Sequence, residues 1–196
     1  MMIHNLKDIC IVITDGTHQT PQYHSTGVVF ISAANIKNGE LDFSDHKYIS
    51  QEEHEFLTKS YKPSVDDILL TKSGSLGDAA LVTKFEFEFS IFESLALIRP
   101  KKEVVCPAFL KQYLCSQFAQ KYFSSITSGV AVKHLHLGDL RKLQIPLPPL
   151  PEQQAIVDVL ESWDKAISLT EKLVKAKERQ YKWLLNKLIL DPIKTR

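Results

Sequence analysis

The sequence predicts an α+β protein, in which a mixed α/β domain is followed by a long protruding C-terminal helix. Short β-branched runs separated by polar turns occupy residues 1–150, and a seven-residue apolar repeat begins at residue 151. Of the 196 residues, 44% are hydrophobic and 24% are charged, which excludes a disordered tail and a collagen-like fibre. We therefore expect two parts, residues 1–150 and residues 151–196.

In the first part, β-branched or alternating runs between turn residues predict strands. These runs are residues 10–14 (CIVIT), 27–32 (GVVFIS), two strands around a glycine-containing turn within 66–82, the strictly alternating 85–92 (FEFEFSIF), and 94–100. A helix over 107–126 is predicted from its opening proline and from apolar residues spaced by three and four. That apolar stripe is Phe109, Leu110, Tyr113, Leu114, Phe118 and Tyr122.

The second part opens with a stiff connector, IPLPPLP at residues 145–151, which carries four prolines. Pro151 is well suited to be the first residue of a helix, which would continue to Leu190 before Asp191-Pro192. Such a helix is about 60 Å long, more than the width of a 150-residue domain, so we expect it to protrude and to need a partner helix. Two rows repeat every seven residues: Leu160, Ile167, Val174, Tyr181 and Leu188, and Trp163, Thr170, Lys177 and Leu184. A helix folded back on its own domain is the alternative.

Three scattered cysteines and the lack of a secretion signal or an apolar run of about 18 residues favour a reduced, cytoplasmic protein. Phosphate-loop, dinucleotide, zinc-protease and nucleophile-elbow motifs are missing, so we expect no catalytic residue and no cofactor. His134 and His136 would face one side of a strand, but no third ligand is identifiable near them, so no metal is expected either.

The net charge is only +1, but the charges are unevenly distributed along the chain. Residues 40–93 hold twelve acidic residues against five lysines, a balance of −7, whereas residues 99–142 hold eight basic residues against two acidic ones, a balance of +6. A nearly neutral chain can therefore still present a basic face to a polyanion.

Three polar segments interrupt the strands: DGTHQTPQYHSTG (15–27), TKSGSLG (71–77) and TSGVAVKHLHLGDL (127–140). Together with IPLPPLPEQQAIVDVLESWDKAISLTEKL from residue 145, they resemble the specificity subunit of type I restriction–modification systems. The resemblance implies a target recognition domain over 1–150 and the family's conserved helix over 151–196. Family members usually have two of each, so this chain is similar to half of such a subunit.

The resemblance also implies partners and contact residues. It implies a non-catalytic homodimer with antiparallel helices that reads an interrupted palindrome in double-stranded DNA, with methyltransferase subunits and a restriction subunit docking on it. S-adenosylmethionine, for adenine methylation, and ATP would bind those partners. The expected DNA contacts are Thr17, His18, Gln19, Thr20, Tyr23, Lys72, Ser73, Ser75, Ser128, Lys133 and His134. The expected helix seam is Leu160, Trp163, Ile167, Val174, Tyr181, Leu184 and Leu188.

Several alternatives remain open at this point. Asp15, Gly16, Gly74 and Gly77 fit pure turn chemistry. The chain could be one half of a split subunit, or an interaction scaffold that binds no DNA. A metal-dependent nuclease would use Asp66, Asp67, Asp78 and Lys72.

Overall fold

The computed structural model describes residues 2–127 and 134–190. The chain divides into two compact units, Met1–Gln154 and Ala155–Arg196, and each is described by itself. No helix in the described ranges combines the length and the apolar character that crossing a membrane requires.

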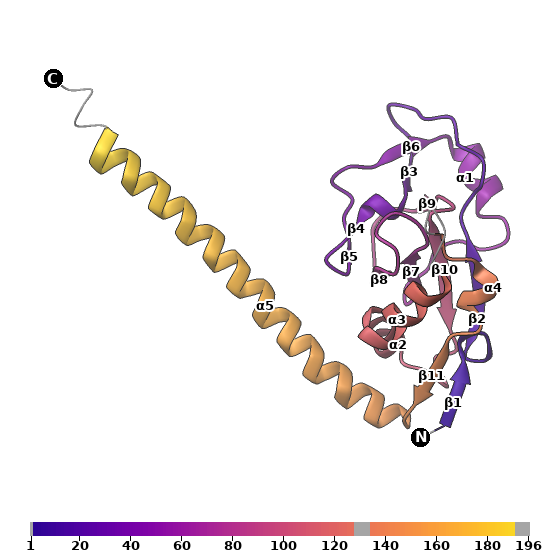
Figure 1. Ribbon diagram of the computed structural model, residues 1–196. Coiled ribbons are helices and arrows are strands. Elements are labelled where there is room, and N and C mark those ends of the chain that lie inside the picture. Colours follow the sequence, from indigo (N-terminus) through magenta and orange to yellow (C-terminus); the bar gives the residue numbers. More distant parts are fainter. Residues whose placement is uncertain (1, 128–133, 191–196) are drawn as a thin grey trace. The chain divides into compact units, whose positions relative to one another are not determined.

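The centre of the first unit is a four-stranded antiparallel sheet, which Figure 1 shows with α4 (Leu137–Leu140) beside its first strand. The register places Leu97 opposite Thr14 on one side and Leu69 on the other. The predicted strands at 10–14, within 66–82 and at 94–100 are confirmed. The strand order is β2 (Cys10–Asp15), β10 (Leu95–Pro100), β7 (Ile68–Thr71), β8 (Ala79–Leu81).

A second, three-stranded sheet contributes to the same core. Its middle strand is β3 (Val28–Ile31), as predicted, which pairs antiparallel with β6 (Lys47–Ile49) and parallel with β9 (Phe89–Ile91). Inward residues of both sheets pack together; they include Val12, Ile31, Leu69, Ile91 and Leu97. The smaller elements are η1 (Leu6–Asp8), η2 (Ala33–Asn35), the pair β4 (Ile36–Lys37) and β5 (Glu40–Leu41), and α1 (Gln51–Leu57), which contacts β9.

The strand predicted over 85–92 is wrong for its first half, because strand pairing begins only at Phe89. The rings of Phe85, Phe87 and Phe89 instead surround Phe43, with centroids 4.8, 5.1 and 5.5 Å from it. The alternation here reflects the packing of aromatic rings on one side of the segment, and for Phe85 and Phe87 this packing occurs without a partner strand.

The single helix predicted over 107–126 is also wrong, since it is broken into α2 (Pro107–Cys115) and α3 (Gln117–Ile126). Ser116 between them is extended, with φ −70° and ψ 157°. The break turns the second helix, so that Phe118 of the predicted stripe is 77% exposed while Ala119 and Phe123 are buried. The first helix packs on β8.

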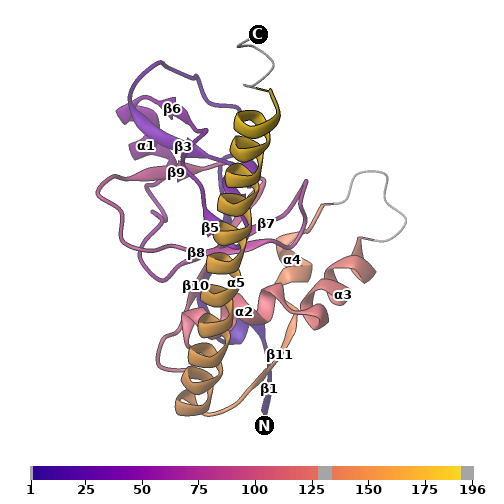
Figure 2. The same ribbon diagram turned by 90° about the vertical axis from the view of Figure 1, so that its left-hand side faces the viewer.

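The proline-rich connector is extended, as predicted, and part of it is strand β11 (Gln144–Leu147), which pairs antiparallel with β1 (Met2–Asn5) in a two-stranded sheet (Figure 2). Helix α5 (Leu150–Leu185) begins one residue before the predicted start at Pro151. It ends in a π-helical turn, η3 (Asn186–Leu190), so the long C-terminal helix is confirmed.

Candidate nucleic-acid interface

The described parts of the three polar segments meet at the C-terminal end of β2. Lys72, in the second segment, donates from Nζ to Oδ2 of Asp15, which opens the first, at 2.5 Å. The third segment joins them through the backbone N–H of Leu135, which donates to the Lys72 carbonyl at 2.9 Å. Segments separated by more than 40 residues in the chain therefore form one surface cluster, which we call the loop cluster (residues 15–23, 71–77 and 134–136).

The first segment is anchored by backbone contacts. The N–H of Thr17 donates to the carbonyl of Ile91 at 3.2 Å, and the N–H of Glu93 donates to the carbonyl of Thr17 at 3.0 Å. A Cβ atom on Gly16 would lie 2.0 Å from the Ile91 carbonyl oxygen, so only glycine allows this approach. Within the turn, the Thr17 hydroxyl accepts from the N–H of Gln19 at 3.1 Å.

His18 lies between two carboxylates. Its Nε2 is 3.3 Å from Asp15 Oδ2, and its Nδ1 is 2.7 Å from Glu93 Oε2, while its side chain stays 65% exposed. No sequence pattern indicated Glu93, and because of this contact we add it to the loop cluster, beside Asp15.

The second segment is a tight turn closed on itself. Its first hydroxyl, on Thr71, donates to the Ser75 carbonyl and accepts from the N–H of Asp78 at 2.9 Å. The amide of Gln120 in α3 supports the turn by donating to the Gly77 carbonyl at 2.9 Å. Ser75 at the tip is exposed and Ser73 is half-buried.

The third segment contributes two histidine rings with centroids 5.2 Å apart, those of His134 and His136. Burial lowers the pKa of His134, and Lys72 and His136 lower it further, while Glu93 and Asp15 oppose the shift. A neutral imidazole at neutral pH can both donate and accept a hydrogen bond, as recognition of a base edge requires. These histidines precede α4 and lie outside any strand, and among the described residues no three ligating side chains form a metal-binding group.

The predicted DNA contacts differ in accessibility. Gln19 and Thr20 are exposed on the first turn. Tyr23 is 46% exposed, and the centroid of its ring lies 6.1 Å from that of Phe30. Lys72 is 2% exposed and its ammonium group is held by Asp15, so its setting is that of a structural ion pair. Its role as a DNA contact stays a prediction, as do those of the other contact residues. Ser128 and Lys133 lie outside the described residues.

The acidic and basic stretches of the sequence pair with each other in part. Arg99 forms hydrogen bonds with both carboxylate oxygens of Asp67 at 2.7 Å, and these bonds raise the pKa of the guanidinium. Lys102 pairs with Asp66 at 2.5 Å. Two of the three carboxylates named for a nuclease, those of Asp66 and Asp67, therefore have separate structural partners.

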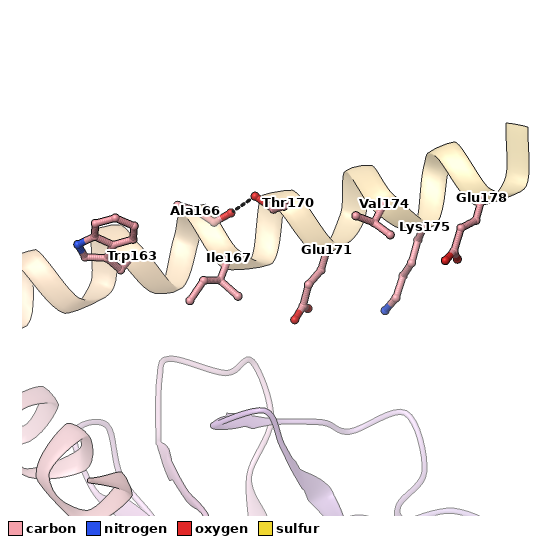
Figure 3. Close-up of a pocket in the computed structure, with 8 residues that line it drawn as sticks. All are labelled: Trp163, Ala166, Ile167, Thr170, Glu171, Val174, Lys175 and Glu178. Carbon is pink, nitrogen blue, oxygen red and sulfur yellow. Dashed lines mark hydrogen bonds between the residues drawn. The ribbon is translucent and has the colours of Figure 1, made fainter. Parts of the chain in front are cut away.

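Helix α5 carries an exposed apolar row in the second unit. Trp163, Ile167 and Val174, labelled in Figure 3, are 66%, 55% and 51% exposed. Thr170 in the same region donates its hydroxyl to the Ala166 carbonyl at 2.8 Å, so its polar group is satisfied within the helix. The other seam residues are also exposed: Leu160 (38%), Tyr181 (66%), Leu184 (38%) and Leu188 (67%).

Comparisons with known proteins agree with the sequence resemblance. The chain is 32% identical over 135 residues to the type I restriction enzyme EcoBI specificity subunit of Escherichia coli, covering 69% of this chain and 28% of that protein. It is 28% identical over 191 residues to the putative MjaX specificity subunit of Methanocaldococcus jannaschii, covering 95% of this chain and 44% of that protein.

Among solved structures, the HsdS subunit from Thermoanaerobacter tengcongensis superposes with a TM-score of 0.66 at 20% identity, covering 95% of this chain and 47% of that one. A chain from a structure of type I restriction–modification complex assembly gives a TM-score of 0.68 at 20% identity, covering 93% of this chain and 43% of that one. The chain thus spans less than half the length of these relatives.

The family description "Type I restriction modification DNA specificity domain" matches residues 1–178, and this range includes the whole loop cluster and most of α5. The fold, the converging turns and this match agree. The chain therefore belongs to the type I restriction–modification DNA specificity family.

Proposed function

We propose that the chain recognises a DNA sequence for a type I restriction–modification complex and catalyses no reaction itself. The observation that carries this proposal is the convergence of three polar turns on the end of β2, where Lys72 forms hydrogen bonds with both Asp15 and Leu135. Base edges are read by short polar side chains held in place by a rigid scaffold, and the sheet beneath the turns is such a scaffold.

The exposed groups of the loop cluster have suitable chemistry for the major groove. Gln19 offers an amide that can both donate to and accept from an adenine edge. The hydroxyl of Ser75 and the neutral ring of His134 are adaptable donors and acceptors. The contacts Thr17, His18, Thr20, Tyr23, Ser73, Ser128 and Lys133 belong to the same proposal, while Lys72 would act mainly by fixing the turn that presents Ser73 and Ser75.

We further infer that two copies pair through α5. The helix has 36 residues, so it is about 54 Å long at 1.5 Å per residue. Its exposed row of large apolar side chains, from Leu160 to Leu184, covers about 36 Å of this length, and such a row is typical of a helix that packs on a partner. An antiparallel homodimer would bury Leu160 and Trp163 of one copy near Tyr181 and Leu184 of the other.

Such a dimer determines the form of the DNA target. A twofold protein presents identical recognition domains in opposite orientations, so the two half-sites form an inverted repeat. The helix pair would set the length of the gap between them. Methyltransferase subunits would bind on the helices, hold S-adenosylmethionine and methylate adenine, and an ATP-dependent restriction subunit would join them.

The test is selection from randomised duplexes by the purified chain, with and without its methyltransferase partner, combined with light scattering. We expect a dimer and enrichment of an interrupted palindrome. A monomer that selects a DNA sequence only when a different chain supplies the second recognition domain would indicate a split subunit. A failure to enrich any sequence, even in the assembled complex, would favour the scaffold and overturn the proposal.

A further inference from the structure

A cationic pocket lies beside the loop cluster, at the free edge of the central sheet. Among the described strands, β2 stands at one end of the sheet order, so one side of its backbone has no strand neighbour. The cavity there has a volume of about 300 Å³. It is lined by Lys7, residues 10–14, Tyr61 and Arg141.

The fold brings the two cations of this pocket together from opposite ends of the first unit. The N–H of Lys7 donates to the Arg141 carbonyl at 3.2 Å, so the two backbones are bonded. The Nη2 atom of Arg141 donates to the Ile13 carbonyl of β2 at 2.8 Å, which holds the guanidinium against the strand edge. A guanidinium has five N–H donors, so most of its donors remain for a ligand.

The positive charge of this pocket is not neutralised by the described residues. Neither Lys7 nor Arg141 has a carboxylate within ion-pair distance in residues 2–127 and 134–190, and no lining residue is acidic. Neighbouring cations differ, since Lys102 pairs with Asp66 and Lys142 pairs with Asp139. An exposed lysine and an arginine that is held in place, with a tyrosine in the same pocket, match an oxyanion such as a phosphodiester.

The pocket continues directly into the loop cluster. Thr14 in its wall immediately precedes Asp15, and Ile13, which holds the guanidinium, is two residues from Asp15, about 7 Å along a strand. Arg141 follows α4, whose N-cap is His136 of the third segment. The loop cluster itself contains the carboxylates of Asp15 and Glu93, and its described lysine, Lys72, is buried.

We propose that this pocket binds a phosphate of the DNA backbone, with Lys7 and Arg141 as its ligands. The inference rests on the proposed function and adds to it a division of labour. The loop cluster, whose two carboxylates outnumber its one described lysine, reads base edges, while the cationic pocket fixes the register of the domain on the duplex by holding a phosphate next to the base pairs that are read.

The experiment uses three variants: Lys7→Gln, Arg141→Gln, and the double variant that combines these two changes. The control is Lys84→Gln, which removes one positive charge after β8, at the opposite edge of the sheet. DNA affinity is measured against salt concentration. Removal of one phosphate ligand should reduce the slope of log affinity against log salt by about 0.9, or about eightfold in affinity near 0.1 M salt, equally for target and random duplexes. Lys84→Gln should change neither slope nor affinity.

An unchanged slope in the double variant, or an equal change with Lys84→Gln, would overturn the proposal. Because Arg141→Gln also removes the hydrogen bond to the Ile13 carbonyl, the melting temperature of every variant is measured. If Arg141→Gln does not fold, Arg141→Lys and Lys7→Gln replace it in the comparison. Should the chain bind no DNA even with its partners, the proposed function fails separately. Inorganic phosphate is then the probe: we expect it to shift the Ile13 amide resonance, and acetate acting equally well would point to a protein carboxylate and against a phosphate site.

Discussion

The Nζ atom of Lys72 lies 2.5 Å from Oδ2 of Asp15, and this ion pair joins the turn at 71–77 to the end of β2. The lysine side chain is 2% exposed and the aspartate side chain is 16% exposed, so the pair is largely shielded from water. Breaking one partner of such a pair leaves a charge that is neither solvated nor neutralised, which costs more than the intact pair contributes.

Lys72→Met is therefore expected to lower the free energy of unfolding by about 3 kcal/mol. The double variant Asp15→Asn with Lys72→Met should cost less than the sum of the single changes, because it removes both charges. Urea unfolding measures all three. Lys142→Met, which removes the exposed partner of Asp139, is the control and should cost under about 1 kcal/mol. A Lys72→Met protein as stable as the control would show that the pair is not structural.

Gly16→Ala should destabilise the first turn by about 3 kcal/mol, because the new Cβ would displace the Ile91 carbonyl that binds Thr17. Gly138→Ala is the matched control, since a Cβ there meets no atom within 4 Å and alanine favours the helical backbone of α4. Thermal melting should separate the two variants clearly. Equal melting temperatures would contradict the close approach at Gly16.

Gln19→Ala should weaken discrimination at one base pair of each half-site by about 1 to 3 kcal/mol while leaving unfolding unchanged. In a homodimer, the loss appears symmetrically on both sides of the gap. Thr83→Ala, an exposed polar residue after β8, is the control. Sequencing of selected duplexes measures the effect, and an unaltered motif would remove Gln19 from the set of reading residues.

Cys10 gives a prediction with a defined pH window. Burial raises the pKa of its thiol from 9.0 to about 12, although Lys101 acts in the opposite direction. Above pH 9 the unfolded chain loses this proton while the folded protein keeps it, so the free energy of unfolding should fall as the pH rises from 9 towards 12. Burial also raises the pKa values of Tyr113 and Tyr122, which adds to the same trend.

Urea unfolding at about pH 8 and about pH 10.5 measures this fall in the free energy of unfolding. Cys10→Ala is the control, and the fall should be smaller in this variant. In the native protein a thiol reagent should leave Cys10 unmodified, because this thiol is buried. Modification of all three cysteines should require denaturation. Rapid native labelling of Cys10 would contradict its burial.

The strands were predictable where a β-branched or alternating run lies between turn residues, as at 10–14 and 94–100. Alternation alone failed at Phe85 and Phe87, because rings that pack on Phe43 produce the same pattern as a paired strand. The helix break at Ser116 could not be predicted from the sequence either, since it depends on how α3 packs. Helix α1 does carry a readable signal, an N-cap serine: Ser50 accepts from the N–H of Glu53 at 3.1 Å.

The candidate site was predictable as a set of turns but not as a network. The pairing of Lys72 with Asp15 spans 57 positions, and the backbone bond between Lys7 and Arg141 spans most of the first unit. Such pairings are set by strand order, which periodicity does not reveal. Glu93 had no local signal, because only the parallel approach of Thr17 to Phe92 brings it to His18.

The helix seam gives the last prediction. Leu160→Glu with Ile167→Glu should convert the dimer into a monomer, because each copy would place two carboxylates in an apolar interface with no partner for them. Ser162→Glu with Ser168→Glu adds the same charges to positions off the seven-residue row and should leave the dimer intact. Light scattering at several concentrations distinguishes the outcomes. If both double variants remain dimeric, the two copies pair elsewhere, and the gap in the DNA target is not set by α5.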